Sequence, residues 1–355
     1  MIDDITIMPC FSLTPSKVVS FNRVFRYSAK KQNLDQEPAA LKNKIIKMVD
    51  KSVNNAVKKK FHNFKISENA YRNLKQKINW LYFLAKSRRV KTYSGKEIFN
   101  FKMAFITLTL PSMQAHSTVE ITKDYFNQFL TEIRQRTGMK NYVWRLEFQK
   151  NGNVHYHLVT DSFLDYFFVK KIWNRILKKG GYVDAYQSKF QNLSLGQYNG
   201  LVNSNSKTDF AVIAKRYAKG CAENWANPNT VDVKSVVSGK KIANYISKYF
   251  GKNEQGNAVC NVLDNEANSF SLRLWFSSRS LSKLKTVTDF VEAVPYDIFT
   301  YFKEMKLGNL YIARWASIVY FEVFNLEGQI RILIEKILRN YAKKQEYQSA
   351  VSAYF

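Results

Sequence analysis

Two stretches with the composition of β-strands, residues 142–149 and 154–160, flank the tripeptide Asn-Gly-Asn at 151–153. An Asn-Gly pair between stretches rich in β-branched and aromatic side chains is a strong signal of a β-hairpin. A hairpin makes its part of the sheet antiparallel. Because helical patterns alternate with strands in the rest of this region, the hairpin favours an α+β fold over a doubly wound parallel sheet.

Hydrophobic periodicity predicts the remaining elements. Residues 102–110 (KMAFITLTL) alternate between two faces, as a strand does. We expect a basic, largely helical N-terminal region (residues 1–100), a central domain (residues 101–255) and a C-terminal region (residues 256–355) with a strand and an amphipathic helix. Further strands are expected at 230–236 and 269–276, helices at 41–60, 68–90, 122–137, 165–178, 209–224 and 240–251, and an amphipathic stripe from 330 to 341.

The chain has only four histidines, and two of them, His155 and His157, stand two positions apart. Residues i and i+2 of a strand point to the same face, so both imidazoles can converge on one ion. Glu147 lies across the hairpin, and a carboxylate with two imidazoles makes an open site for a divalent cation. The alternative is a surface hairpin whose histidines bind nothing.

The length of the hairpin loop decides whether Glu147 can reach the histidines. A two-residue turn at 151–152 would pair Glu147 with Tyr156 and direct the carboxylate to the opposite face. A three-residue loop at 151–153, with its glycine in the left-handed conformation of a bulge, pairs Glu147 with His157 instead. We therefore predict an odd-length loop or a bulge.

Residues 240–252 read KKIANYISKYFGK and predict a helix with two different faces. Tyr245 and Tyr249 are neighbours at i and i+4 and share an arc with lysines, whereas the other arc is apolar. A phenol is a poor nucleophile at neutral pH, but nearby ammonium groups favour the phenolate, and a metal ion can polarise the phosphate that it attacks. This combination suits covalent cleavage of a phosphodiester. The lysines of the arc are Lys241, Lys248 and Lys252.

The chain has 55 Lys and Arg against 28 Asp and Glu, and the formal net charge of +27 predicts a polyanionic partner. The longest apolar run, residues 310–325, is interrupted by charges and too short to span a bilayer, so nucleic acid is favoured over a membrane. Residues 273–281 (RLWFSSRSL) have a composition that suits a single nucleic-acid strand. Three widely spaced cysteines fit no disulfide framework, so we expect a cytoplasmic location. The residues expected to contact DNA are Lys58, Lys59, Lys60, Arg88, Arg89, Lys241 and Lys252.

Three motifs in a fixed order resemble those of the HUH endonuclease superfamily, and specifically rolling-circle replication initiators of the two-tyrosine type found in microviruses and related plasmids. Residues 105–111 (FITLTLP) are similar to the first, structural motif. Glu147 followed by residues 155–157 (HYH) resembles the metal-binding motif. Residues 245–249 (YISKY) resemble the nucleophile motif. The resemblance covers roughly residues 101–252.

The resemblance implies a mainly antiparallel five-stranded sheet flanked by helices, with an endonuclease domain over residues 101–255 and helical extensions at both ends. It also implies a divalent cation, Mg²⁺ or Mn²⁺, held by Glu147, His155 and His157. Such an ion would polarise the phosphate under attack and position it.

The resemblance further implies roles for the tyrosine helix. Tyr245 would attack the scissile phosphate of single-stranded origin DNA, form a 5′-phosphotyrosine link and free a 3′-hydroxyl. Tyr249 would make the second attack after one round of synthesis, although the two tyrosines can exchange roles. Lys248 would support the phenolate or the phosphate.

The function leaves two alternatives open. The chain can be a transposase or relaxase of the same superfamily with the same chemistry, or a non-catalytic DNA-binding protein whose tyrosines and histidines are structural. The sequence contains no G-x-x-x-x-G-K-[ST] phosphate loop. We therefore expect no ATPase or helicase activity in this chain, and we expect a host helicase and polymerase as partners in the host cytoplasm.

Overall fold

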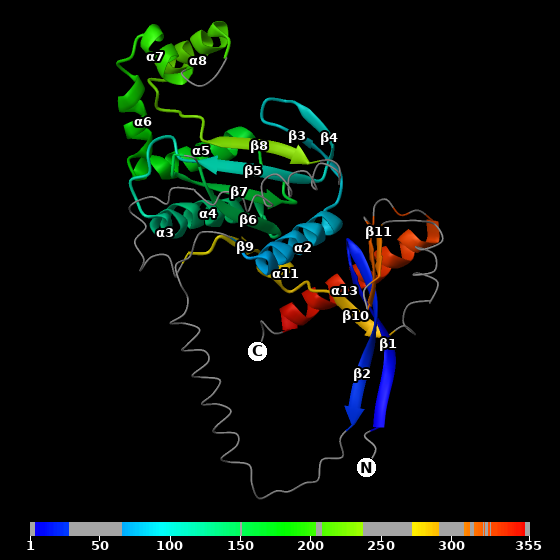
Figure 1. Ribbon diagram of the computed structural model, residues 1–355. Coiled ribbons are helices and arrows are strands. Elements are labelled where there is room, and N and C mark those ends of the chain that lie inside the picture. Colours follow the sequence, from blue (N-terminus) through cyan, green and yellow to red (C-terminus); the bar gives the residue numbers. More distant parts are fainter. Residues whose placement is uncertain are drawn as a thin grey trace, which may run out of the picture. The chain divides into compact units, whose positions relative to one another are not determined.

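The computed structural model of the chain divides into two compact units (Figure 1). The central unit comprises residues 65–283, and the terminal unit comprises residues 1–64 together with residues 284–355. The division at residues 100 and 255 that composition suggested stays a prediction. The structure describes residues 4–27, 66–149, 151–203, 208–236, 272–290, 309–312, 316–321, 323, 326 and 328–351.

The central unit is built on a five-stranded sheet in which every pair of neighbouring strands is antiparallel. Its strand order is β8–β5–β7–β6–β9 (Figure 1). The expected α+β fold, with a five-stranded antiparallel sheet flanked by helices, is confirmed. The strands are β5 (Met103–Thr109), β6 (Tyr142–Phe148), β7 (Val154–Thr160), β8 (Val231–Val236) and β9 (Trp275–Ser277).

Helices with well-formed termini pack on this sheet. A continuous helical segment consists of α3 (Thr118–Glu120), the π-helical turn η1 (Ile121–Phe126) and α4 (Asn127–Thr137). It begins at a capping box between Ser117 and Glu120 and ends at Gly138, whose φ of 65° is left-handed. α5 (Tyr166–Lys179) begins at Asp165, whose carboxylate accepts hydrogen bonds from two backbone N–H groups.

The helix expected over residues 68–90 is shorter in the structure. α2 (Glu68–Leu84) begins with Ser67 as its N-cap, contacts β6 and β9, and is followed by a separate β-hairpin. The hairpin consists of β3 (Arg88–Lys91) and β4 (Glu97–Phe101), joined by a turn in which Gly95 has a φ of 83°. The prediction for residues 85–90 was wrong because strand pairing overrides their local charge pattern. The helices expected at 41–60 and 240–251 lie outside the described residues.

Three short helices follow α5 and share a small aromatic core. α8 (Phe210–Ala222) confirms the helix expected at 209–224, whereas α6 (Tyr182–Phe190) and α7 (Leu195–Asn203) were not expected. Trp225 lies at the centre of this core, with its ring packed against Phe190 and Tyr198. A four-residue helix, α11 (Arg279–Ser282), follows β9 and contacts α2.

The terminal unit contains a second five-stranded sheet, with the order β10–β1–β2–β12–β11. Its longest strands form a hairpin at the start of the chain, which corrects the expectation that residues 1–100 are largely helical. Thr14 Oγ1 accepts hydrogen bonds from the N–H groups of Ser16 and Lys17, which closes this hairpin. None of the described helices is long and apolar enough to cross a membrane. The elements are β1 (Asp4–Thr14), β2 (Lys17–Tyr27), β10 (Val287–Phe290), β11 (Asn309–Ile312), β12 (Ala316–Tyr320) and the expected amphipathic helix α13 (Gly328–Val351).

Candidate metal centre

The connection between β6 and β7 has the odd length that the candidate ligand set requires. Glu147 pairs with His155, in a register that leaves residues 149–153 between the two strands. The expected odd-length loop is confirmed, but the expected pairing of Glu147 with His157 is wrong by two residues. Because the side-chain period of a strand is also two, Glu147 and both histidines still lie on one face of the sheet.

The turn that sets this register is held by its own hydrogen bonds and by the loop that follows β5. Gly152 has a φ of 83° and donates its N–H to Gln149 O at 2.9 Å, while Gln149 N–H donates to Asn153 O at 2.8 Å. The side chain of Asn153 is buried and bonded at both ends: its Oδ1 accepts from Gln114 N–H at 2.9 Å, and its Nδ2 donates to Ser112 O at 2.7 Å. These bonds fix the start of β7, and therefore the position of the histidines, by contacts that are distant in sequence.

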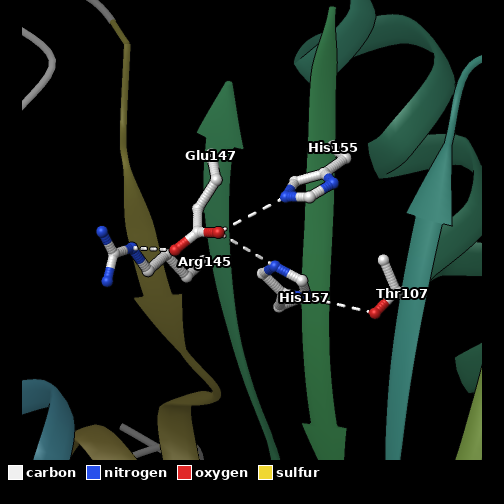
Figure 2. Close-up of polar contacts among 5 residues, drawn as sticks. All are labelled: Thr107, Arg145, Glu147, His155 and His157. Carbon is white, nitrogen blue, oxygen red and sulfur yellow. Dashed lines mark hydrogen bonds and ion pairs between the residues drawn. The ribbon is translucent and has the colours of Figure 1, made fainter. Parts of the chain in front are cut away.

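The three candidate ligands converge on one small volume (Figure 2). Glu147 Oε2 lies 3.3 Å from His155 Nε2 and 3.1 Å from His157 Nε2. All the candidate ligand atoms lie within 4.8 Å of one another. Two ligands at adjacent corners of an octahedron, each about 2.1 Å from the ion, are about 3.0 Å apart. The side chains therefore fit a single metal ion.

Neighbouring side chains hold these ligands in place (Figure 2). Thr107 Oγ1 lies 3.1 Å from His157 Nδ1, and the Phe105 ring stacks on the same imidazole with centroids 5.4 Å apart. Arg145 Nε lies 3.4 Å from the second carboxylate oxygen, Glu147 Oε1. Outer contacts of this kind orient metal ligands and set the tautomer of a histidine. Neither Thr107 nor Arg145 was expected from the sequence.

Thr107 suits both tautomers of His157. In the metal-free protein, Nε2–H of His157 donates to Glu147, so Nδ1 accepts from the threonine hydroxyl. When Nε2 is a metal ligand, the proton lies on Nδ1, and the same hydroxyl oxygen accepts it. A hydroxyl therefore keeps the ring oriented in both states.

The ionisation states of the cluster match those that metal binding needs. Burial opposes the ionisation of Glu147, but hydrogen bonds from His155 and His157, with the charge of Arg145, lower its pKa to about 2. Burial lowers the pKa of His157, which keeps this imidazole neutral at neutral pH. An ionised carboxylate and a neutral imidazole can bind a cation without first releasing a proton.

The low pKa of Glu147 predicts a pH dependence of stability in the metal-free protein. A folded-state pKa of about 2, against an ordinary value of 4.5, stabilises the fold above pH 4.5, and this contribution is lost as the pH falls toward 2. It amounts to about 3 kcal/mol at neutral pH. Urea unfolding of wild type and Glu147→Gln should give a stability difference that shrinks over this range. A difference that does not change with pH would contradict this account of the carboxylate.

The contact between Thr107 and His157 predicts a role in metal affinity. Replacing Thr107 with valine keeps the shape but removes the hydroxyl, so the affinity for Mn²⁺ should fall about tenfold to a hundredfold. Paramagnetic resonance of free Mn²⁺ during a titration measures this change. Thr109→Val is the matched control, because that hydroxyl donates to Thr230 O and not to a candidate ligand. Equal affinities for Thr107→Val and wild type would remove the orienting role.

The remaining sequence-predicted residues are not brought to this cluster in the described part of the chain. Arg88 and Arg89 lie exposed on β3, where Arg88 Nη2 donates to Asp161 O at 2.9 Å and Arg89 stacks over the Phe99 ring. Their contact with DNA stays a prediction. Tyr245, Tyr249, Lys248, Lys241, Lys252, Lys58, Lys59 and Lys60 lie outside the described residues.

The candidate ligands lie inside a stretch of the chain that matches a known family. Residues 103–254 match the family model of the replication-associated protein ORF2 and its relatives, and this stretch is less than half of the chain. It begins at β5 and contains Glu147, His155 and His157. No curated protein and no solved structure matches the chain. The family match supports a replication initiator, and a cluster that can hold a metal ion lies inside the matched residues.

Proposed function

We propose that the chain initiates rolling-circle replication by nicking and joining single-stranded origin DNA through a covalent 5′-phosphotyrosine intermediate. The observation that carries this proposal is the convergence of one carboxylate and two imidazole nitrogens, within residues that match a replication-associated family. Histidines without a ligand role on a surface hairpin do not account for this convergence, because His157 is buried and oriented by Thr107 and Phe105.

Glu147, His155 and His157 would hold a divalent cation, and their oxygen and nitrogen donors suit Mn²⁺ or Mg²⁺. When bound, the cation polarises the scissile phosphate and neutralises charge that develops during the attack. The protein's part is to present these donors preorganised. Arg145 neutralises the outer oxygen of Glu147, so that the inner oxygen stays directed at the histidines.

Strand cleavage would be a transesterification. The phenolate oxygen of Tyr245 forms a bond to the phosphorus of the scissile phosphate, and the bond from that phosphorus to the 3′-oxygen breaks. The 3′-oxygen takes up a proton and leaves as a 3′-hydroxyl, which primes synthesis. Lys248 favours the phenolate through its positive charge. One phosphodiester is exchanged for another, so the step needs no nucleotide hydrolysis.

Rejoining would reverse this exchange. Tyr249 attacks the regenerated origin after one round, and the new 3′-hydroxyl attacks the phosphorus held by Tyr245, which releases the phenol and closes the strand. Unwinding and synthesis would come from a host helicase and a host polymerase in the cytoplasm.

The grip on DNA would come from basic residues outside the metal centre. On the β3–β4 hairpin, Arg88 and Arg89 lie beside Tyr93 and Phe99, which are 71% and 61% exposed. Basic and aromatic side chains together suit a single strand, because phosphates pair with the former and bases stack on the latter. The other proposed phosphate contacts are Lys58, Lys59, Lys60, Lys241 and Lys252.

The test is incubation of the purified chain with single-stranded origin DNA and Mn²⁺, followed by denaturing electrophoresis. We expect a nicked strand and a protein–DNA adduct that resists detergent, and both should be absent with EDTA. A protein that shifts the DNA in a native gel but forms no adduct on any single strand would be the non-catalytic DNA-binding alternative. Adduct formation on transposon ends or transfer origins alone would favour the transposase or relaxase.

A further inference from the structure

A cavity of about 380 Å³ lies beside the edge of the central sheet, on the face opposite the metal centre. Successive residues of a strand point to opposite faces, so Tyr142 and Trp144 of β6 lie on one face while Glu147 lies on the other. The helical segment from α3 to α4 forms the other wall. The lining residues that matter here are Lys123, Asn127, Tyr142, Trp144, Arg273 and Phe276.

The walls of the cavity combine flat aromatic rings with positive charge. The Phe276 ring lies 6.3 Å from Trp144 and 6.4 Å from Tyr142, measured between centroids, and tilts by 31° and 39° against them. The guanidinium carbon of Arg273 lies 5.7 Å from the centre of the Phe276 ring. Lys123 and Arg273 are exposed, and none of the described residues that line the cavity is acidic. This chemistry selects a planar apolar group attached to an anion.

The helical wall has an unusual backbone at this point. Residues Ile121–Phe126 form a π-helical turn, and it supplies Thr122 and Lys123 to the cavity. The Thr122 hydroxyl donates to Thr118 O at 2.7 Å. π-helical turns are rare, and they occur frequently at functional sites. The backbone of the wall therefore points to a ligand site independently of the side chains.

A single side chain connects this wall to the metal strand. Tyr156 lies between His155 and His157 on β7, but on the opposite face, and is buried. Its ring stacks on Phe126 of the π-helical turn with centroids 4.0 Å apart, and its hydroxyl lies 2.9 Å from Thr122 Oγ1. A tyrosine suits this position because its hydroxyl meets the π-helical turn. The cavity wall and the candidate ligands are thus joined through one strand.

We propose that this cavity binds one unpaired nucleotide of a single DNA strand, at a site separate from the scissile phosphate. The base would stack against Trp144 and Phe276, with the Asn127 amide available to its polar edge. Lys123 and Arg273 would pair with the adjoining phosphates. The inference rests on the proposed function for the identity of the strand, and it adds a second point of attachment on the far face of the sheet.

The test measures binding to a fluorescein-labelled oligothymidylate of about 12 nucleotides, a length that a single-strand-binding surface covers. The full chain is used in EDTA, so that cleavage does not contribute. Phe276→Leu keeps an apolar side chain but removes the ring, and its affinity should fall about fivefold to a hundredfold. Phe276→Trp should bind as wild type does. Phe167→Leu is the matched control, because Phe167 is an exposed aromatic on α5 outside the cavity.

Two further measurements separate the base from the phosphate. An abasic strand of equal length should compete at least about fivefold more weakly than oligothymidylate for wild type, and this preference should diminish in Phe276→Leu. Arg273→Gln should reduce the slope of log affinity against log salt by about 0.7, the effect of one lost phosphate contact. Arg279→Gln, on α11 outside the cavity, should leave the slope unchanged.

Wild-type binding by both Phe276→Leu and Arg273→Gln would overturn the proposal, and so would equal competition by the abasic strand or by a duplex. Adduct formation distinguishes this failure from failure of the proposed function. A chain that forms the adduct but shows no effect of these variants loses only the cavity. A chain that forms no adduct but shows the full pattern of effects keeps the cavity and loses the nicking activity.

Discussion

Replacing His157 with alanine should abolish strand cleavage and adduct formation while binding to single-stranded DNA persists. His157 is the most buried of the three candidate ligands, with 1% of its side chain exposed, and Thr107 and Phe105 hold its ring. Removing it leaves two protein ligands and a hole in the wall of the site. Phosphate polarisation by a metal ion is worth several kcal/mol, so cleavage should slow by about a thousandfold or more.

The matched control is His116→Ala. That imidazole lies outside the cluster and is held between the hydroxyls of Tyr182 and Tyr125, at 2.9 Å and 3.1 Å. It should cleave DNA as wild type does. A titration of Mn²⁺ into each variant shows whether lost cleavage follows lost metal. Cleavage by His157→Ala at the wild-type rate would show that this histidine is not a ligand of a catalytic ion.

The double variant Tyr245→Phe, Tyr249→Phe should form no covalent adduct, because phenylalanine keeps the ring but has no oxygen to bond to phosphorus. Each single variant should retain adduct, since either phenol can make the first attack. Binding in EDTA should be unchanged within about twofold, because neither hydroxyl is needed for phosphate contacts by neighbouring lysines. Detergent-resistant complexes on a radiolabelled strand give the measurement.

Tyr93→Phe is the control for this second prediction. Tyr93 is an exposed tyrosine on the β3–β4 hairpin, and its removal should leave adduct formation intact. If the double variant forms as much adduct as wild type, the nucleophile lies elsewhere, and the similarity of residues 245–249 to a nucleophile motif does not reflect their chemistry.

The metal ligands were predictable because their signal is local. Two histidines at i and i+2, a glutamate across an Asn-Gly hairpin and the period of a strand are enough to place three side chains on one face. The register was not fully predictable, because it depends on Asn153, whose side chain is clamped by Gln114 and Ser112 from a loop about 40 residues earlier in the chain.

Thr107 and Arg145 were missed for a related reason. Arg145 stands two residues before Glu147, and Thr107 lies on one of the two alternating faces of its strand, so both had the right periodicity. What the chain does not reveal locally is that β5 lies next to β7, which brings Thr107 opposite His157. The strand that begins at Arg88 was missed because it forms by pairing with β4, which its own charge pattern does not show.

The most direct measurement is the chemical identity of the protein–DNA link. Wild type is incubated with single-stranded origin DNA and Mn²⁺, the adduct is digested with nuclease and protease, and the peptides are sequenced by mass spectrometry. We expect a nucleotide joined through its 5′-phosphate to Tyr245 or Tyr249, and a released strand that ends in a 3′-hydroxyl. A nicked strand with a free 5′-phosphate and no modified tyrosine would mean that water is the nucleophile, and it would contradict the proposed covalent mechanism.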